Sequence, residues 1–278
     1  MSAVIKLSFP ATKQFWEIPI LFEDDHLLAL YKPSGLTTSL DTIFPERPSL
    51  MQLLHDAIAQ KKPWTSECRL TFLAASHHLD DAASGALLVA KSKAVQAALA
   101  DKFSTDSPER KYVAIVRGSP QADSFEVDAK LAPHQTETDL MCIDARRGKK
   151  SKTRVVVTER FSGYAMVTCE PVPDRNHQIR LHLRHSGLPL CGDELYGGRP
   201  LLLSRLKKSY RLKEGRTELP LLSRPALHAR EISIPHPVTG DALTISAPLP
   251  KDIRVALKYL RQFSGTNPQA SIDPSGEN

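Results

Sequence analysis

Short β-rich segments joined by tight turns recur along the chain, and they limit its fold more than any other feature. Such segments are predicted at residues 18–22, 27–31, 86–90, 111–116, 153–159, 165–171, 230–234 and 242–246. Amphipathic helices are predicted at 49–61 and 92–103, where Ser49 and Ser92 are suited to cap them. Because strands and helices alternate irregularly, with hairpin-length turns, we expect an α+β fold with a mixed, mostly antiparallel sheet and flanking helices.

The composition is that of a globular protein with a basic surface. Of its 278 residues, 41% are hydrophobic and 24% charged, and the formal net charge of +6 is compatible with a phosphate-bearing partner. The four cysteines are scattered without a C-x-x-C pair, which argues against a zinc ribbon and a disulfide framework. We find no leader-like segment, no run apolar enough to span a bilayer and no nucleotide-binding glycine motif. These observations predict a cytoplasmic protein without a membrane association.

The stretch SHHLDDAASGALLVAK, residues 76–91, raises the first functional question. It places Asp80 and Asp81 directly before a glycine-containing turn and an apolar run. Such a pair could be a solvated turn, or it could hold a nucleophile or an acid–base group at the edge of a cleft. The pair alone does not decide between the two.

The second informative stretch is DRNHQIRLHLRHSGLPLCGDELYGG, residues 174–198. Its first half alternates as a strand would, yet Asn176 could cap a helix and Gly187 could end one, so both structures remain open. The three histidines of the stretch would suit a metal, but no acidic residue completes an H-E-x-x-H motif among them. The interspersed arginines instead favour an anion, either a carboxylate of the protein or RNA phosphate.

These stretches resemble motifs of the RluA-type pseudouridine synthases. Residues 77–91 are similar to the family's H-R-L-D-x-x-T-S-G-L-L-L-V-A-K motif. Five further blocks occur in the family's order: EDDHLLALYKPSGL, ERKYVAIVRG, GKKSKT, RNHQIRLHLRHSGLPLCGDELYG and RPALHAREISIPHPVTGD. Each block is weak evidence alone, but together they extend over residues 20 to 250.

The resemblance implies isomerisation of uridine to pseudouridine in RNA, by a catalytic fold with a central cleft and without a cofactor or a metal. Asp80 matches the family's catalytic aspartate. Arg180 matches the arginine that pairs with it, and a carboxylate in a dry pocket needs such a cation to stay ionised. Tyr112 matches the tyrosine that stacks on the uracil and takes the proton from its C5 atom. The expected domains are an N-terminal extension at 1–16, the catalytic domain at 17–262 and a disordered tail at 263–278.

The chain departs from the family pattern at a few positions. His78 stands where the family has arginine, and a planar histidine could still fill the place of a flipped base. Asn176 replaces threonine and Ala83 replaces another threonine. A basic segment at 204–216 could supply phosphate contacts, or it could be a solvated surface. The expected RNA contacts are His78, Asn176, His177, Gln178, Lys207, Lys208 and Arg211.

The partner expected from the resemblance is structured RNA, either ribosomal or transfer RNA, bound by a monomer. Two alternatives remain open. A non-catalytic RNA-binding relative is conceivable because of His78 and Ala83, and it would bind RNA without product. A metal-dependent hydrolase would use the histidine-rich stretches and would contain zinc.

Overall fold

The computed structural model describes residues 4–40, 46–105, 108–138 and 140–265. The last helix extends to Ser264, and residues 266–278, which make up most of the expected disordered tail, lie outside the described residues.

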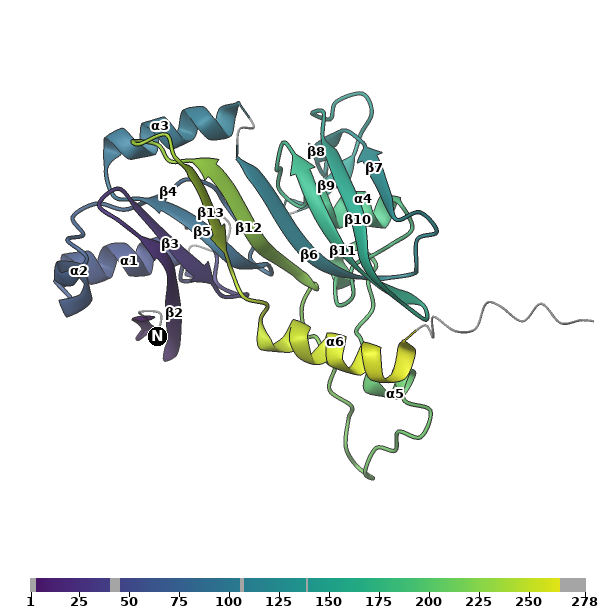
Figure 1. The fold of residues 1–278 in the computed structure, drawn as a ribbon. Coiled ribbons are helices and arrows are strands. Elements are labelled where there is room, and N and C mark those ends of the chain that lie inside the picture. The colour runs from purple at the N-terminus through teal and green to yellow at the C-terminus, as the bar shows by residue number, and fades with distance from the viewer. Residues whose placement is uncertain (1–3, 41–45, 106–107, 139, 266–278) are drawn as a thin grey trace, which may run out of the picture.

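A large, strongly curved sheet forms the frame of the molecule (Figure 1). Its strands follow the order β1-β2-β3-β5-β12-β6-β11-β10-β7, with β13 beside β12 and β4 beside β5. All neighbours are antiparallel except β5 and β12, which pair in parallel at Gly85 and Ala229. A separate two-stranded ribbon joins β8 to β9. The strands are β1 (Val4–Phe9), β2 (Gln14–Glu23), β3 (Leu27–Lys32), β4 (Ala74–Ala75), β5 (Ser84–Ala90), β6 (Glu109–Arg117), β7 (Ser124–Asp128), β8 (Leu131–Pro133), β9 (Met141–Ile143), β10 (Lys152–Phe161), β11 (Tyr164–Val172), β12 (Leu227–Pro235) and β13 (Ala242–Ser246).

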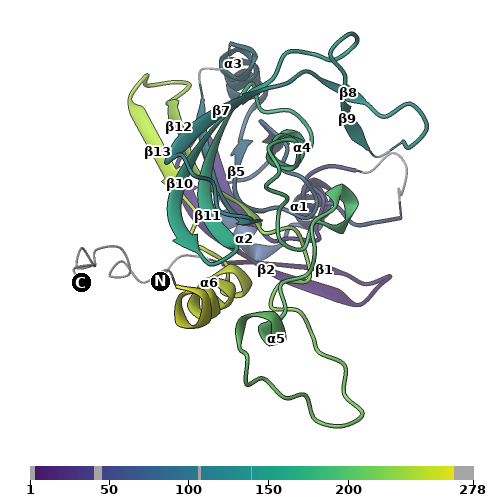
Figure 2. The ribbon, with the colours of Figure 1, turned by 90° about the vertical axis from the view of Figure 1, so that its right-hand side faces the viewer.

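Helices cover both faces of this sheet, so its central strands are buried on both sides. The helices are α1 (Leu50–Ala59), α2 (Pro63–Glu67), α3 (Lys93–Ser104), α4 (Gln178–His185), α5 (Leu203–Leu206) and α6 (Lys251–Ser264), with a 3-10 turn at Glu194–Tyr196. Figure 2 shows α1 and α4 on the same side of the sheet, where both contribute to one hydrophobic cluster. Helices α3 and α6 contribute to two other clusters. Successive side chains of β6 point to opposite faces of the sheet. Ala114 packs in the cluster that contains α1 and α4, and Ile115 packs in the cluster that contains α6.

The predicted elements agree with the structure, and the α+β fold is confirmed. Ser49 caps α1 by accepting from the amide of Gln52, and Ser92 caps α3 by accepting from the amide of Val95, each at 3.2 Å. The turn between β2 and β3 is stabilised by Asp24, whose Oδ1 accepts two backbone N–H bonds at 2.7 Å.

The N-terminal hairpin extends the sheet. Strand β1 pairs along β2, and Ile5 and Leu7 are 1% and 3% exposed within the cluster that includes α1. Ile5 and Leu7, with the partly buried Phe9 and Trp16, therefore join the hairpin to the main core.

The open question at residues 174–198 is answered by a helix rather than a strand. Helix α4 buries Ile179 and Leu183 against the sheet, one turn apart. The expected cap at Asn176 is wrong, because the N-cap is His177, in the left-handed region at φ 54° and without a side-chain cap bond. Histidine tolerates this conformation better than a β-branched residue would.

Candidate active site

A cleft of about 1240 Å³ opens where several parts of the chain meet. They include the loop before β5, the first half of β6, the turn leading into α4 and the loop around the 3-10 turn. Asp80, Tyr112 and Arg180 all line this cleft, although they are far apart in the sequence. The cleft is therefore the candidate active site.

Arg180 links two carboxylates within the cleft. Its Nε and Nη2 atoms donate to Asp193 at 2.8 and 2.7 Å, and its Nη1 atom lies 3.7 Å from Oδ2 of Asp80. The side chain of Asp193 is 1% exposed and that of Asp80 is 14% exposed. The guanidinium group also lies over the ring of Tyr196, 4.8 Å from its centroid. The buried Asp193 thus fixes the orientation of Arg180, and the more accessible Asp80 shares its charge.

The backbone at the start of α4 also faces Asp80. The N–H of His177 points at Oδ1 of Asp80 at 3.5 Å, which is a long contact. The Nδ1 atom of His177 lies 2.7 Å from the hydroxyl of Tyr196. The carboxylate of Asp80 therefore meets positive charge and a backbone donor from the same helix end.

A second buried group in the cleft centres on Tyr112. Its hydroxyl donates to Oδ2 of Asp174 at 2.6 Å, and Nε of Arg110 lies 3.7 Å from the same oxygen. Burial and the neighbouring carboxylate raise the pKa of Tyr112 well above its usual value of 10.0. Burial also raises the pKa of Asp174 to about 6. The tyrosine is thus protonated in the absence of substrate, and it points its proton at a carboxylate.

Two cations hold the loop that presents Asp80. The Nζ atom of Lys32, which is 0% exposed, donates to the backbone oxygens of Pro33, Leu36, Asp81 and Ala83 at 2.7 to 3.2 Å. Burial lowers the pKa of Lys32 to about 7.

Arg224 supports the same part of the loop as Lys32 does. It donates to the backbone oxygen of Ala82 at 3.3 Å and to Oγ of Ser84 at 3.2 Å, while Asp252 pairs with it at 2.8 Å. Residues 81–84, directly after Asp80, are therefore held by buried or half-buried donors from two other segments, which limits the positions that Asp80 can take.

The expected RNA contacts divide into three groups. His78, Asn176 and His177 line the cleft, and the first two are exposed. Gln178 also lines the cleft, but it is 1% exposed and its amide donates to the backbone oxygen of Lys152 at 2.9 Å. It therefore joins α4 to β10. The residues Lys207, Lys208 and Arg211 follow α5 and are not among the residues that line the cleft.

Three residues of the site were missed from the sequence. Asp193 lies within the GDELYG block of the sequence. It could have been anticipated, because a buried arginine that faces a partly exposed carboxylate needs a second acceptor for its remaining N–H groups. Asp174 and Lys32 also stand in the quoted blocks, but only the fold places them against Tyr112 and the Asp80 loop.

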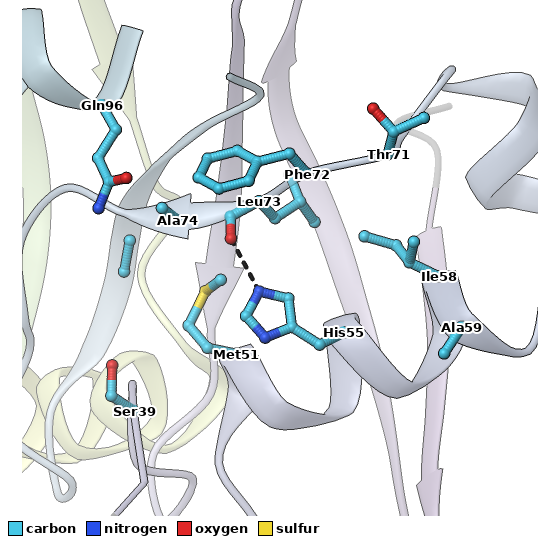
Figure 3. A pocket seen from close by; sticks show the side chains of 11 residues that line it. Ser39, Met51, His55, Ile58, Ala59, Thr71, Phe72, Leu73, Ala74 and Gln96 are labelled. Atoms are coloured by element: carbon cyan, nitrogen blue, oxygen red, sulfur yellow. Dashed lines mark hydrogen bonds between the residues drawn. The ribbon is translucent and has the colours of Figure 1, made fainter. Parts of the chain in front are cut away.

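A second hollow, of about 640 Å³, lies between α1 and the segment leading into β4 (Figure 3). Met51, Ile58 and Phe72 give it an apolar lining. The ring of His55 points across it to the backbone oxygen of Leu73, at 2.8 Å. It has none of the paired charges that distinguish the cleft.

The part of the chain that the structure describes holds no group of three or more His, Cys, Asp or Glu side chains suited to a metal ion. Within the same residues, no helix has the length and apolar character needed to cross a membrane.

Comparisons with known proteins identify relatives of the chain. The model of a family described as RNA pseudouridylate synthase matches residues 26–185. The ribosomal large subunit pseudouridine synthase C of Salmonella typhi is 34% identical over 243 residues, which cover 87% of this chain and 70% of that protein. The synthase D of Xanthomonas campestris is 29% identical over 269 residues, covering 95% and 76% of the two chains. The solved structure of human RNA pseudouridylate synthase domain containing 4 superposes with a TM-score of 0.67, at 22% identity, covering 87% of this chain and 92% of that one.

The chain therefore belongs to the RNA pseudouridylate synthase family. The prediction of an RluA-type RNA pseudouridine synthase, an isomerase that acts on RNA, is confirmed by these matches.

Proposed function

We propose that this protein converts uridine to pseudouridine in structured RNA, with Asp80, Tyr112 and Arg180 as its catalytic residues. The observation that carries the proposal is the pairing of Asp80, 14% exposed, with a buried Arg180 in the same cleft as Tyr112. The curated relatives are named as synthases acting on the large ribosomal subunit. Ribosomal RNA is therefore the first substrate to test, and transfer RNA the second.

The reaction detaches uracil from C1′ of the ribose, turns the base and rejoins it through C5. A target base stacked in RNA must first leave its helix, at a cost of a few kcal/mol. The cleft is wide enough for a flipped nucleotide and is lined by exposed His78 and Asn176. Asp80 would then promote cleavage of the glycosidic bond, and Arg180 would keep that carboxylate ionised as water is excluded.

Several properties belong to the same proposal. The reaction is an isomerisation with no net oxidation or reduction, so it needs no redox cofactor. We propose that a monomer carries it out in the cytoplasm without a metal, with residues 17–262 as the catalytic domain. Activity that persists with a zinc chelator would support this, and a single-protomer mass in solution would support the monomer.

The test of the proposed function is tritium release from RNA labelled at uridine C5. Unmodified transcripts of ribosomal and transfer RNA serve as substrates for the wild-type protein, Asp80→Asn and His78→Ala. We expect release by the wild type, a loss of at least about 10³-fold in Asp80→Asn, and a much smaller loss in His78→Ala. Equal losses in the two variants would contradict an auxiliary role for His78. RNA binding without release by the wild type would instead favour a non-catalytic relative.

A further inference from the structure

The contact between Tyr112 and Asp174 poses a chemical question that the pairing of Asp80 with Arg180 does not answer. The O–H to Oδ2 distance is 2.6 Å, and both residues line the cleft with Asp80. Tyr112 is 5% exposed on β6, and the Asp174 side chain is 12% exposed in the turn before α4. A short hydrogen bond between two buried groups, open to the substrate on one side, is a path along which a proton can move.

The proposed reaction needs such a path. After uracil has rejoined the ribose through C5, that carbon still carries its original hydrogen. A protonated tyrosine can accept this proton only if its own proton leaves at the same time. Because burial keeps the pKa of Tyr112 well above 10.0, the tyrosine does not lose its proton to solvent beforehand.

We propose that Asp174 accepts the hydroxyl proton of Tyr112 while Tyr112 accepts the proton from C5. The C5–H bond breaks and its electron pair forms the C5–C6 double bond of the uracil ring, while the π pair of the N1–C6 bond moves onto N1. The C5 proton moves to the tyrosine oxygen, and the former hydroxyl proton moves to Oδ2 of Asp174. The negative charge thus passes from Asp174 to N1 of the ring. N1 then takes a proton from solvent, which completes pseudouridine, and Asp174 returns its proton to solvent. This inference rests on the proposed function.

Asp174 acts through Tyr112, so it is a positioning and proton-accepting residue. The charged groups that face it are Arg110 on β6, at 3.7 Å, and Asp80 in the loop before β5. Arg110 favours the carboxylate, whereas burial and Asp80 oppose it. With a pKa of about 6, Asp174 is mostly ionised at neutral pH and becomes a poorer acceptor as the pH falls below that value.

The test measures turnover of RNA that carries hydrogen or deuterium at uridine C5, by wild-type protein and by Asp174→Asn. The asparagine keeps the shape and an oxygen that accepts the tyrosine bond, but it cannot take a proton at neutral pH. We expect the maximal rate to fall by about 10²-fold with little change in the KM for RNA. The isotope effect at C5 is expected to rise, because loss of the C5 proton becomes the slow step.

Three comparisons separate this role from a structural one. Asp174→Glu, which restores a carboxylate, is expected to recover part of the rate. Asp174→Asn is expected to add no further loss in a Tyr112→Phe background, because the two residues act as one unit. In the wild type the isotope effect is expected to increase below about pH 6, with the pKa of Asp174, and to stay constant in Asp174→Asn. The wild-type pH series needs no variant, so it decides the matter even if Asp174→Asn does not fold.

The possible failures are distinguishable. If the wild type releases no C5 tritium, the proposed function itself fails. If the wild type is active while Asp174→Asn has the same rate and the same isotope effect, only the role of Asp174 is overturned. A wild-type isotope effect that does not change across the pH series overturns it as well.

Discussion

Asp174 is a carboxylate that the fold buries at a cost in stability. Its pKa in the folded protein is about 6, against a usual value of 3.8, because burial disfavours the charged form. The folded state therefore binds a proton more tightly than the unfolded chain does. By linkage, this residue lowers the free energy of unfolding as the pH rises from about 4 to about 6, and the loss persists above that range. Such a cost is common where function requires a buried charge.

We expect Asp174→Asn to raise the free energy of unfolding at pH 7 by roughly 2 kcal/mol, because the buried charge is removed. Urea unfolding at pH 4, 5, 6 and 7 measures the effect. The two proteins should have similar stability at pH 4 and should diverge up to about pH 6, the folded pKa. Equal stability of the two proteins at pH 7 would show that Arg110 already offsets the burial.

At the scale of elements, the site depends on how closely β5 approaches β12. Gly85 of β5 has φ 132° and lies against the backbone of Ala229, so a Cβ atom there would overlap that backbone. The parallel pairing of the two strands is confined to Ser84 and Gly85, directly after the loop of Asp80. The glycine thus sets the position of the loop as well as the strand contact.

We expect Gly85→Ala to destabilise the protein by more than about 3 kcal/mol and to abolish tritium release, because the overlap forces β5 away from β12. Chemical unfolding and the release assay measure the two effects. Gly163→Ala is the matched control. Gly163 also has a positive φ, of 77°, but a Cβ there meets nothing within 4 Å. Its cost should be about 1 kcal/mol, with activity retained. Similar costs for the two variants would contradict the close approach as the cause.

The elements differ in how far the sequence predicts them. The helices capped by Ser49 and Ser92 were predictable, because capping and periodicity are local. Helix α4 was ambiguous, because its polar face is used inside the protein, as the buried Gln178 and Arg180 show. The family resemblance predicted the meeting of Arg180 with Asp80. The bond from Tyr112 to Asp174 was not predicted, because it depends on how the turn before α4 packs over β6.

At the scale of the whole molecule, the basic charge is spread beyond the cleft. The net charge is +6, yet Lys207, Lys208 and Arg211 follow α5 and do not belong to the cleft lining. Lys207 contacts the ring of Phe263 on α6, 5.8 Å from its centroid. The three residues belong to a segment between Leu195 and Pro225, both of which line the cleft. An RNA stem that extends from the cleft along this side would reach these cations.

We expect the triple variant Lys207→Gln, Lys208→Gln and Arg211→Gln to lower the slope of RNA affinity against salt concentration by about 2, because fewer counterions are released. Titrations at several salt concentrations measure the slope, and single-turnover rates at saturating RNA should change little. Replacement of Lys6, Lys13 and Lys93, which lie outside the segment between Leu195 and Pro225, is the matched control. An unchanged slope in the first variant would remove this segment from the RNA interface.

The position of β12 in the sheet has a consequence for synthesis of the protein on the ribosome. This strand comes late in the chain, at Leu227–Pro235, but in the sheet it lies between β5 and β6. The loop of Asp80 leads into β5, and Tyr112 is a residue of β6. A nascent chain that ends before residue 227 lacks the strand that joins the two halves of the sheet. The halves of the sheet can form local hairpins during translation, but the cleft can form only after β12 has emerged and joined them. The growing polypeptide is therefore inactive toward RNA until nearly all of its described residues have left the exit tunnel.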